Sequence, residues 1–436
     1  MKEIAEIENS TRIHKKEILE KIMVVVYAIS IYTINVAPQF SNAIKYIVLP
    51  ICILALFNTK SFDFLIFPLT FLDDSFGTLI MGRITFIWIY FALFMFKKLY
   101  IICRRSNNNF YIAKSDLWSD LATIFLSFYF TFFGVLEHGM PYIKCFFVVL
   151  CVLGFRNDLK SGKTLSKLQF IIIVFSLVPA ISVITGQGGH ISYFNRRIGF
   201  GFTDPNYCSS ICLVGLCASL FINKKGVLRF LNVVIPGIFI IAVIICASLT
   251  GVTIAVGLIV LKIWTEGTLA KKVKYISTII LFSLLAFVVF APKFGEEFFS
   301  SLTNRFDFLS LNSNLSINDL TSGRTSIAMI YMNYFFGQGF LKQLFGGNVL
   351  NCSSLFSKIG GIHVTHNTII DHLIVFGILG TVVMYILYIN RLRKYMERKK
   401  SDKKFYMIIF MKISVFLYSL TLAYLEVPVW WFMMLL

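Results

Sequence analysis

Charged residues are scarce in this sequence, and their scarcity sets the first limit on what the chain can be. Only 14% of the 436 residues are charged, whereas 57% are hydrophobic and the mean hydropathy is +0.77. A soluble domain carries about a quarter charged residues, and its core cannot absorb this much apolar surface. We therefore expect lipid to be the solvent for most of the chain.

Patterns typical of several other protein classes are also missing. The nine cysteines show neither a disulfide framework nor the paired spacing of a zinc site, and eight of them lie in or beside apolar runs. No Walker-type loop occurs, and no small-residue cleavage pattern follows the first apolar run. The net charge of +19 does not indicate nucleic-acid binding, because the basic residues stand in short clusters between apolar runs. We expect no metal, cofactor or nucleic-acid partner, and a first helix that stays as an anchor.

Apolar runs fill most of the sequence, and a helix needs roughly 20 such residues to cross the hydrocarbon core of a bilayer. The third run is the weakest, since three aspartates and a proline interrupt it. The pattern predicts an all-α integral membrane protein, a polytopic bundle of about 12–14 transmembrane helices. The runs lie at 22–37, 43–58, 62–77, 82–96, 117–136, 141–155, 168–186, 206–222, 231–247, 250–264, 276–292, 372–389 and 406–422, with a shorter one at 424–436.

Basic residues indicate how the runs thread the membrane. With the N-terminus in the cytoplasm and alternating sides, the loops that fall inside are basic, as the positive-inside rule requires; they lie at 97–116, 156–167, 223–230, 265–275 and 390–405. The predicted organisation is a cytoplasmic N-terminus at 1–21, a transmembrane bundle at 22–292 with a short outer loop at 187–205, a long outer (periplasmic or extracellular) loop at 293–371, and C-terminal transmembrane helices at 372–436.

The short outer loop carries an unusual pair of arginines. Arg196 and Arg197 oppose the preference for positive charge on the inner side, so they need a partner or a function there. Gly201 permits close backbone approach, and the Asp-Pro-Asn sequence that ends at Asn206 predicts a turn that starts the next helix. Two interpretations stay open: the arginines extend to lipid phosphates, or they bind a ligand.

The long outer loop spans 79 residues, and few connections reach that length without a function. An apolar and aromatic stretch follows Arg324, which predicts a helix on the membrane surface, capped by Ser322 or Thr321. A Phe-Gly-Gly turn follows at 345–347, and Arg305 is a further charged residue earlier in the loop.

Three of the six histidines lie within ten residues, where the long loop meets the next apolar run. His363, His366 and His372, together with Asp371, are conceivable metal ligands, but their spacing matches no strong zinc signature. An interfacial hydrogen bond is the commoner role for such a histidine, and a general base is the sharper alternative. We therefore predict no metal and keep His366, with Asn367 beside it, as candidate site residues.

Arginines on the outer surface of a membrane suit an anionic substrate that the membrane itself holds. Guanidinium binds phosphate through two hydrogen bonds and keeps its charge at any relevant pH. A lipid diphosphate is such a substrate, because fixed arginines stabilise the charge that develops as the diphosphate leaves, while a histidine takes a proton from the attacking hydroxyl. Since no nucleotide is available outside the cytoplasm, the energy-rich donor has to be lipid-linked.

Four short motifs follow one another in a fixed order. The first is Arg-x-x-x-Gly-Phe-x-x-Pro-Asn from Arg197 to Asn206, and the second is Ser-Gly-Arg, ending at Arg324. The third is the Phe-Gly-Gly turn at 345–347, and the fourth is Thr-His-Asn at 365–367. This ordered set resembles the bacterial O-antigen polymerase and O-antigen ligase superfamily (Wzy-type and WaaL-type proteins).

The resemblance covers about 187–390, and the first 160 residues match only in being hydrophobic. It implies a GT-C-like glycosyltransferase of the bacterial inner (cytoplasmic) membrane. The enzyme would polymerise undecaprenyl-diphosphate-linked oligosaccharide repeat units into O-antigen, capsule or exopolysaccharide on the outer face, without metal or cofactor. Implied partners are the lipid-linked glycan donor and acceptor, membrane lipid, a chain-length regulator and a flippase.

Site roles also follow from the resemblance, position by position. Arg197 and Arg324 would hold the diphosphate, and His366 would be the base or would orient the acceptor. This chain has two arginines where the family has one, so which of the pair contacts the diphosphate stays open. The remaining residues expected to contact substrate are Arg196, Gly201, Asn206, Arg305, His363 and Asn367.

Two alternatives compete with the polymerase. An O-antigen ligase transfers the finished chain to lipid A-core and uses the same kind of donor, so the motifs do not separate the two enzymes. A flippase for lipid-linked oligosaccharides has a similar number of spans, but such transporters tend to have internal repeats and ionisable residues at mid-membrane. The sequence shows no convincing repeat, and a long outer loop has no use in a simple flippase.

Overall fold

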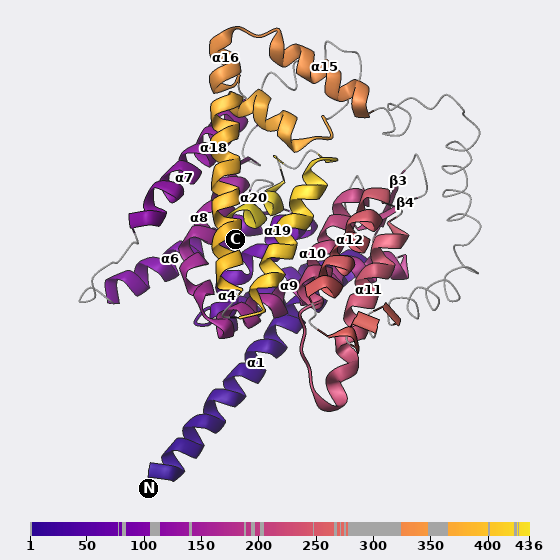
Figure 1. Cartoon of the computed structure of the whole chain (residues 1–436). Coiled ribbons are helices and arrows are strands. Elements are labelled where there is room, and N and C mark those ends of the chain that lie inside the picture. Colours follow the sequence, from indigo (N-terminus) through magenta and orange to yellow (C-terminus); the bar gives the residue numbers. More distant parts are fainter. Residues whose placement is uncertain are drawn as a thin grey trace.

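The computed structural model describes most of the chain as a bundle of helices (Figure 1). The described residues are 2–76, 78–80, 84–104, 114–138, 142–186, 189–192, 197–200, 205–246, 248–265, 268–270, 272–273, 276–277, 324–347, 365–399, 402–422, 425 and 427–436.

The N-terminal half follows the predicted runs. Leu65 separates α4 from α5 in the third run, which the sequence identified as the weakest. The elements are α1 (Lys2–Val36), η1 (Pro38–Phe40), α2 (Ser41–Ala43), the π-helical η2 (Ile44–Val48), α3 (Leu49–Leu56), α4 (Lys60–Phe64), α5 (Ile66–Phe76), α6 (Phe86–Arg104), α7 (Lys114–His138), α8 (Ile143–Arg156), η4 (Asn157–Lys160) and α9 (Gly162–Thr185).

The C-terminal half continues the bundle and adds two helices from the long loop, α15 and α16. The elements are α10 (Pro205–Ser219), η5 (Gly226–Phe230), α11 (Leu231–Ile245), α12 (Leu249–Thr265), α15 (Arg324–Phe336), α16 (Phe340–Phe345), α18 (Thr368–Arg398), α19 (Phe405–Ser419) and α20 (Pro428–Leu435).

Four helices in the described part of the chain are long and apolar enough to cross a membrane, by length and composition: Leu117–Leu136, Gly162–Thr185, Gly226–Ile245 and Thr368–Arg398. Further apolar helices, such as α12 and α19, are shorter. The apolar run at 276–292 lies almost entirely outside the described residues. The chain is therefore a helical protein with helices of the kind that cross membranes.

Two short antiparallel strand pairs interrupt the helical pattern, and no sequence pattern predicted them. β1 (Thr78–Ile80) pairs with β2 (Ile84–Thr85). β3 (Gly189–Ser192) pairs with β4 (Arg197–Phe200), so the short loop expected at 187–205 contains a hairpin.

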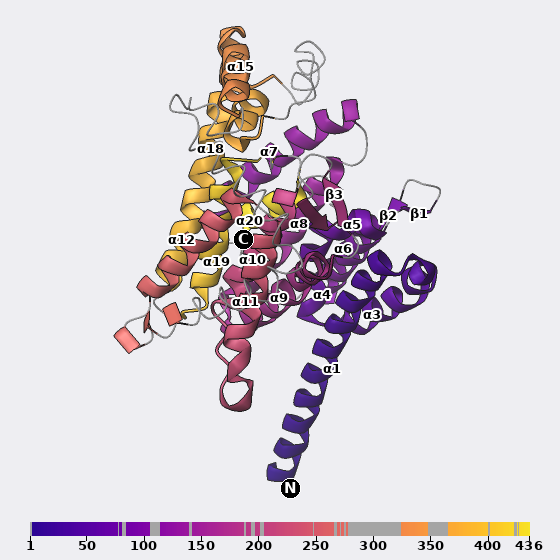
Figure 2. The ribbon, with the colours of Figure 1, turned by 90° about the vertical axis from the view of Figure 1, so that its right-hand side faces the viewer.

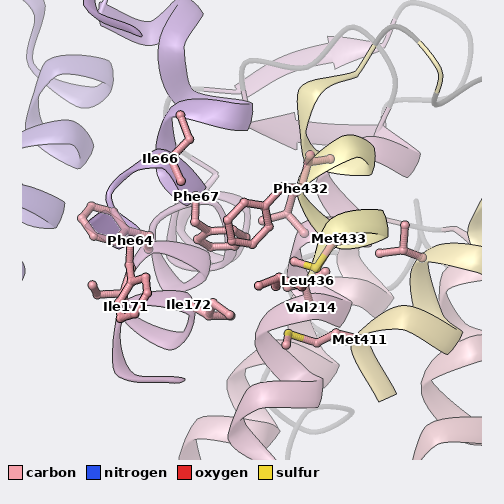
Figure 3. Packing of buried hydrophobic residues seen from close by; sticks show 14 of the residues in the cluster. Phe64, Ile66, Phe67, Ile171, Ile172, Val214, Met411, Phe432, Met433 and Leu436 are labelled. Atoms are coloured by element: carbon pink, nitrogen blue, oxygen red, sulfur yellow. The ribbon is translucent and has the colours of Figure 1, made fainter. Parts of the chain in front are cut away.

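The core lies where α4 and α5 meet α9, α10, α19 and α20 (Figure 3). Phe432 of α20 packs on Phe67 of α5, with ring centroids 5.3 Å apart. The Nζ of the buried Lys412 in α19 donates to the carbonyls of Met433 (3.0 Å) and Met434 (2.8 Å) at the end of α20. A helix leaves its last carbonyls without partners inside the helix, so these acceptors account for a lysine in the interior.

Charged side chains join the helices at the end of the bundle from which α1 projects. Lys167 of α9 pairs with Glu20 of α1 at 2.6 Å, and Arg156 pairs with Asp120 of α7 at 2.8 Å. A hydrogen bond from Lys163, with its positive charge, lowers the pKa of the Glu17 carboxyl. Helices α15 and α16 lie at the opposite end of the molecule, the α15 end (Figures 1 and 2).

A buried ion cluster at the α1 end gives a first prediction. Asp63 is fully buried, with the Nζ atoms of Lys97 and Lys98 at 2.6 and 2.9 Å from its two carboxylate oxygens. Removing one partner of a buried pair leaves an uncompensated charge, which typically costs about 3–5 kcal/mol. We expect Asp63→Asn to lower the free energy of unfolding by about 3 kcal/mol. The measurement is the unfolding transition of the purified protein in detergent.

The matched control for this prediction is Asp158→Asn. Asp158 pairs with Lys60 at 2.5 Å, but the two side chains are 37% and 45% exposed. Exposed pairs contribute about 0–1 kcal/mol, so this variant should unfold almost as the parent does. Equal losses of stability in the two variants would contradict the assignment of Asp63 as a buried anchor.

Candidate functional site

The Thr-His-Asn motif forms a tightly hydrogen-bonded turn immediately before α18. The Oδ1 of Asn367 accepts from the backbone N–H groups of Ile369 (2.9 Å) and Ile370 (3.3 Å), which makes Asn367 the N-cap of α18. The hydroxyl of Thr365 accepts from the Asn367 N–H (3.3 Å) and donates to Oδ1 of Asp371 (2.6 Å). Asn367 thus satisfies backbone N–H groups that a helix start leaves without partners, and Thr365 joins the turn to Asp371.

His366 stands at the centre of this turn in an uncommon conformation. Among the described residues it is the one non-glycine residue with a positive φ, 51°. Such a backbone costs roughly 1–2 kcal/mol for an L-residue, so the contacts on either side have to enforce it. Strained residues of this kind cluster at functional sites, which makes His366 a stronger candidate than its sequence alone did.

Helix α15 packs on the first turns of α18. The predicted helix is present and is described from Arg324 on, and both helices start on the same side of the molecule (Figure 1). Tyr331 of α15 packs against Ile370 and Ile374 of α18 in a small cluster of its own. Because Ile370 lies one helical turn beyond His366, α15 rests directly on the turns that follow the motif. The expected caps, Ser322 and Thr321, lie outside the described residues.

The Phe-Gly-Gly turn locks α16 to α18. Gly346 has a φ of +86°, and a Cβ added there would lie 2.0 Å from the carbonyl oxygen of Val375. The N–H of Gly347 donates to the carbonyl of Ile374 at 2.9 Å. That carbonyl is open to an outside donor because α18 is kinked at Gly377, whose φ is 66° and ψ is −175°. The third motif therefore joins the backbone of the long loop to the backbone of α18.

The first motif lies on a different part of the fold. Arg197 begins β4, and β4 contacts α9 and α10. The side chain of Arg197 is not among the described ones. Asn206 is buried in the first turn of α10, after Pro205 at the first helical position, where proline is well suited. The predicted helix that contains Asn206 is confirmed, while the turn before it and the relation of Arg197 to the α15 end stay predictions.

The contact of α15 with α18 brings together the segments that carry Arg324 and His366, and His366 and Asn367 lie in one turn. Four predicted residues are not tested, because they lie outside the described residues: Arg196, Gly201, Arg305 and His363. Thr365, Asp371 and Gly377 were not among the predicted substrate-binding residues. In the sequence, Thr365 and Asp371 are visible only as polar residues on either side of Asn367, and Gly377 only as a glycine within an apolar run.

The metal hypothesis gains no support from the residues whose positions the structure gives. No group of three or more His, Cys, Asp or Glu side chains in that part of the chain is arranged to hold a metal ion. His372, one of the conceivable ligands, is fully buried, with Nδ1 3.2 Å from the Tyr385 hydroxyl and its ring 4.8 Å from that of Trp430. It belongs to the packed interior.

No protein-family model, curated protein or solved structure matches this chain. The fold and the site therefore describe the chain as a helical protein with apolar helices long enough to span a membrane. Its candidate site is a strained polar turn before α18, on whose first turns α15 packs.

The N-cap offers a test of how the turn is built. We expect Asn367→Ala to destabilise the start of α18 by about 1 kcal/mol, because two backbone N–H groups lose their acceptor. Asn367→Asp keeps a capping oxygen and should retain most of the stability. Hydrogen exchange of the backbone amides at 368–371 is the measurement. Equal protection of these amides in all three proteins would contradict the capping role.

Proposed function

We propose that this protein is a membrane glycosyltransferase of the bacterial inner membrane. It polymerises undecaprenyl-diphosphate-linked oligosaccharide repeat units into O-antigen, capsule or exopolysaccharide on the outer face. The observation that carries the proposal is the docking of α15, which begins at Arg324, on the first turns of α18 after His366. The proposal includes the polytopic GT-C-like bundle with a cytoplasmic N-terminus and about 12–14 spans.

The geometry supports this function because three of the four motifs have an identifiable place in the structure. Arg324, the last residue of the Ser-Gly-Arg motif, lies at the described start of α15. The Phe-Gly-Gly turn fixes α16 to the kink of α18, and Thr-His-Asn holds His366 in its strained turn. These features meet at the α15 end, away from the ion pairs at the α1 end (Figures 1 and 2). An outer face for the α15 end agrees with the basic loops predicted at the other end.

The chemistry assigned to the site is a displacement at the anomeric carbon of the donor sugar. An acceptor hydroxyl forms the new glycosidic bond while the bond to the lipid diphosphate breaks. Arg324, with Arg197 from the short loop, binds the diphosphate and stabilises the charge that develops on it. His366 contacts the reacting sugars beside the diphosphate. Fixed positive charges in a water-poor site act strongly, so neither metal nor nucleotide is required.

Deletion of the gene in its host, with surface glycans resolved by size, tests the proposal. The polymerase predicts loss of long chains while single repeats remain on their carrier or core. Full-length chains stranded on undecaprenyl diphosphate would favour the ligase. Repeat units held in the cytoplasmic leaflet would exclude both enzymes and favour a flippase. A polymerase is also expected to work beside a flippase and a chain-length regulator, so their deletion should alter chain number or length.

A further inference from the structure

A groove in the apolar surface of the bundle lies between α12 and α19. Its volume is about 490 Å³, and it is lined by residues of α12 between Leu249 and Leu261 and by Ile413 and Leu417 of α19. Among the lining residues Leu258 is buried, whereas Leu249 is 60% exposed, so the groove opens at the surface. A volume of this size lies within the range of roughly 300–1,000 Å³ that is usual for ligand pockets.

Gly257 keeps the middle of this groove open. The residue is exposed, and a Cβ added to it would meet no atom of the described chain within 4 Å. Glycines in membrane helices usually allow a second helix to approach closely, and Gly251 of the same helix does so, because an added Cβ would collide with the Ser209 hydroxyl. Gly257 has no such neighbour among the described residues, so it leaves room for a ligand.

The chemistry of the groove suits an apolar chain. Its lining residues include no charged side chain, and the hydroxyl of Thr253 donates to the Leu249 carbonyl of its own helix at 2.9 Å. Helix α12 is an apolar helix of 17 residues. A sugar or a phosphate would lose its hydrogen bonds to water on such walls, whereas a hydrocarbon chain would not.

One end of the groove leads toward the turn that carries His366. The hydroxyls of Ser248 and Tyr418 are hydrogen-bonded at 2.7 Å, which joins the start of α12 to the last turn of α19. A few residues further on, the Leu422 carbonyl accepts a 2.7 Å hydrogen bond from the hydroxyl of Thr368, the first residue of α18. The groove is therefore connected by direct contacts to the start of α18.

Resting on the proposed function, we propose that the groove between α12 and α19 holds the polyprenyl chain of the lipid-linked donor. A chain that lies along α12 from Leu261 to Leu249 carries its diphosphate toward the start of α18, where the candidate site lies. The chain of a bulk phospholipid would fit the same walls, but its headgroup has no place in the transfer reaction. The groove thus orients the donor and sets the depth of its diphosphate in the membrane.

Gly257→Leu tests the groove by filling it. Leucine is a better helix former than glycine, so the variant should accumulate and fold as the parent does. We expect the KM for an undecaprenyl-diphosphate-linked repeat unit to rise about three- to tenfold, because the chain loses packing contacts, while kcat stays within about twofold. The measurement is chain extension by the purified full-length protein over a range of donor concentrations at fixed detergent.

Two controls accompany this variant. Val256→Leu adds bulk to the same helix at a position that is 56% exposed and does not line the groove, so it should keep the parent KM. A donor with a short prenyl chain that ends near the diphosphate should give the parent and Gly257→Leu the same KM, because such a chain does not reach the filled position.

A diazirine within the chain of undecaprenyl diphosphate gives a readout that does not depend on activity. On irradiation of the parent protein in vesicles, we expect label on peptides of α12 and α19. Unlabelled undecaprenyl diphosphate should compete with the labelling, and added phospholipid should not. Label that phospholipid displaces equally well would assign the groove to bulk lipid, and label found outside α12 and α19, as in the run at 276–292, would also overturn the proposal.

The outcomes separate the groove from the function on which it rests. A parent protein that extends chains, with a Gly257→Leu variant that keeps the parent KM for the full-length donor, overturns the groove and leaves the transferase standing. A parent protein that extends no chain, but is labelled competitively on α12 and α19, removes the proposed function and leaves a binding site for a polyprenyl chain.

Discussion

Arg324→Ala is expected to abolish chain extension while the protein stays in the membrane at the parent level. Arg324 begins α15 and is partly exposed, so its loss removes a fixed positive charge without opening the core. Removing one preorganised group that stabilises transition-state charge costs about 10²–10³ in kcat. The rate of chain extension should fall by at least that factor. The measurement is glycan length in a deletion strain that carries the variant gene, beside the level of the protein.

The control for Arg324→Ala is Lys342→Ala. Lys342 is an exposed basic residue of α16, on the same long loop. If only the overall positive charge of the loop mattered, the two variants would behave alike. Arg324→Lys keeps the charge but loses the planar pair of donors, and should recover little activity. Long chains produced at the parent rate by Arg324→Ala would remove this residue from the site.

Gly346→Ala is expected to undo the junction between α16 and α18. A methyl group at Gly346 would lie 2.0 Å from the Val375 oxygen and 2.8 Å from the Gly377 N, both of which are backbone atoms. The positive φ adds a further cost of about 1–2 kcal/mol for alanine. Since no flexible side chain can move aside, we expect a loss of about 4 kcal/mol or more. Protein level, unfolding temperature and activity should all fall together.

Gly339→Ala is the matched control for the junction. Gly339 is the N-cap of α16, with an ordinary φ of −62°, and an added Cβ would meet no atom within 4 Å. This variant should be as stable and as active as the parent. If Gly346→Ala also behaves as the parent does, α16 is not locked to α18 and the third motif loses its structural explanation.

The helices were largely predictable because hydrophobic run length is a strong signal in a chain of this kind. The runs at 117–136 and 168–186 correspond to α7 and α9. Their ends were less predictable, since α18 extends from Thr368 to Arg398, beyond the apolar run at 372–389. Hydrogen bonding continues a helix past its apolar part into the basic residues that follow.

Irregular features were harder to predict from the sequence. The β3–β4 hairpin consists of two four-residue strands in a polar loop, where no clear alternation of apolar and polar residues marks them. The kink at Gly377 frees the Ile374 carbonyl, which accepts from the Gly347 N–H of another segment. A glycine in an apolar run does not reveal such a tertiary contact.

The site itself was predictable only in part. Arg324 and His366 were identified from residue type and from the resemblance, and the structure adds the helix contact that brings their segments together. The pairing of Thr365 with Asp371 needed the N-cap geometry of Asn367, which turns the chain back so that residues six apart meet. That geometry also accounts for the strained backbone of His366.

The most direct test of the proposed function uses the purified protein in lipid vesicles with an undecaprenyl-diphosphate-linked repeat unit as the sole substrate. We predict a ladder of products that grow by whole repeats, with one undecaprenyl diphosphate released for each repeat added, in the absence of metal and nucleotide. Arg324→Ala should give no ladder. Recovery of the repeat unit unchanged, or a product formed only when nucleotide is supplied, would contradict the proposed polymerase.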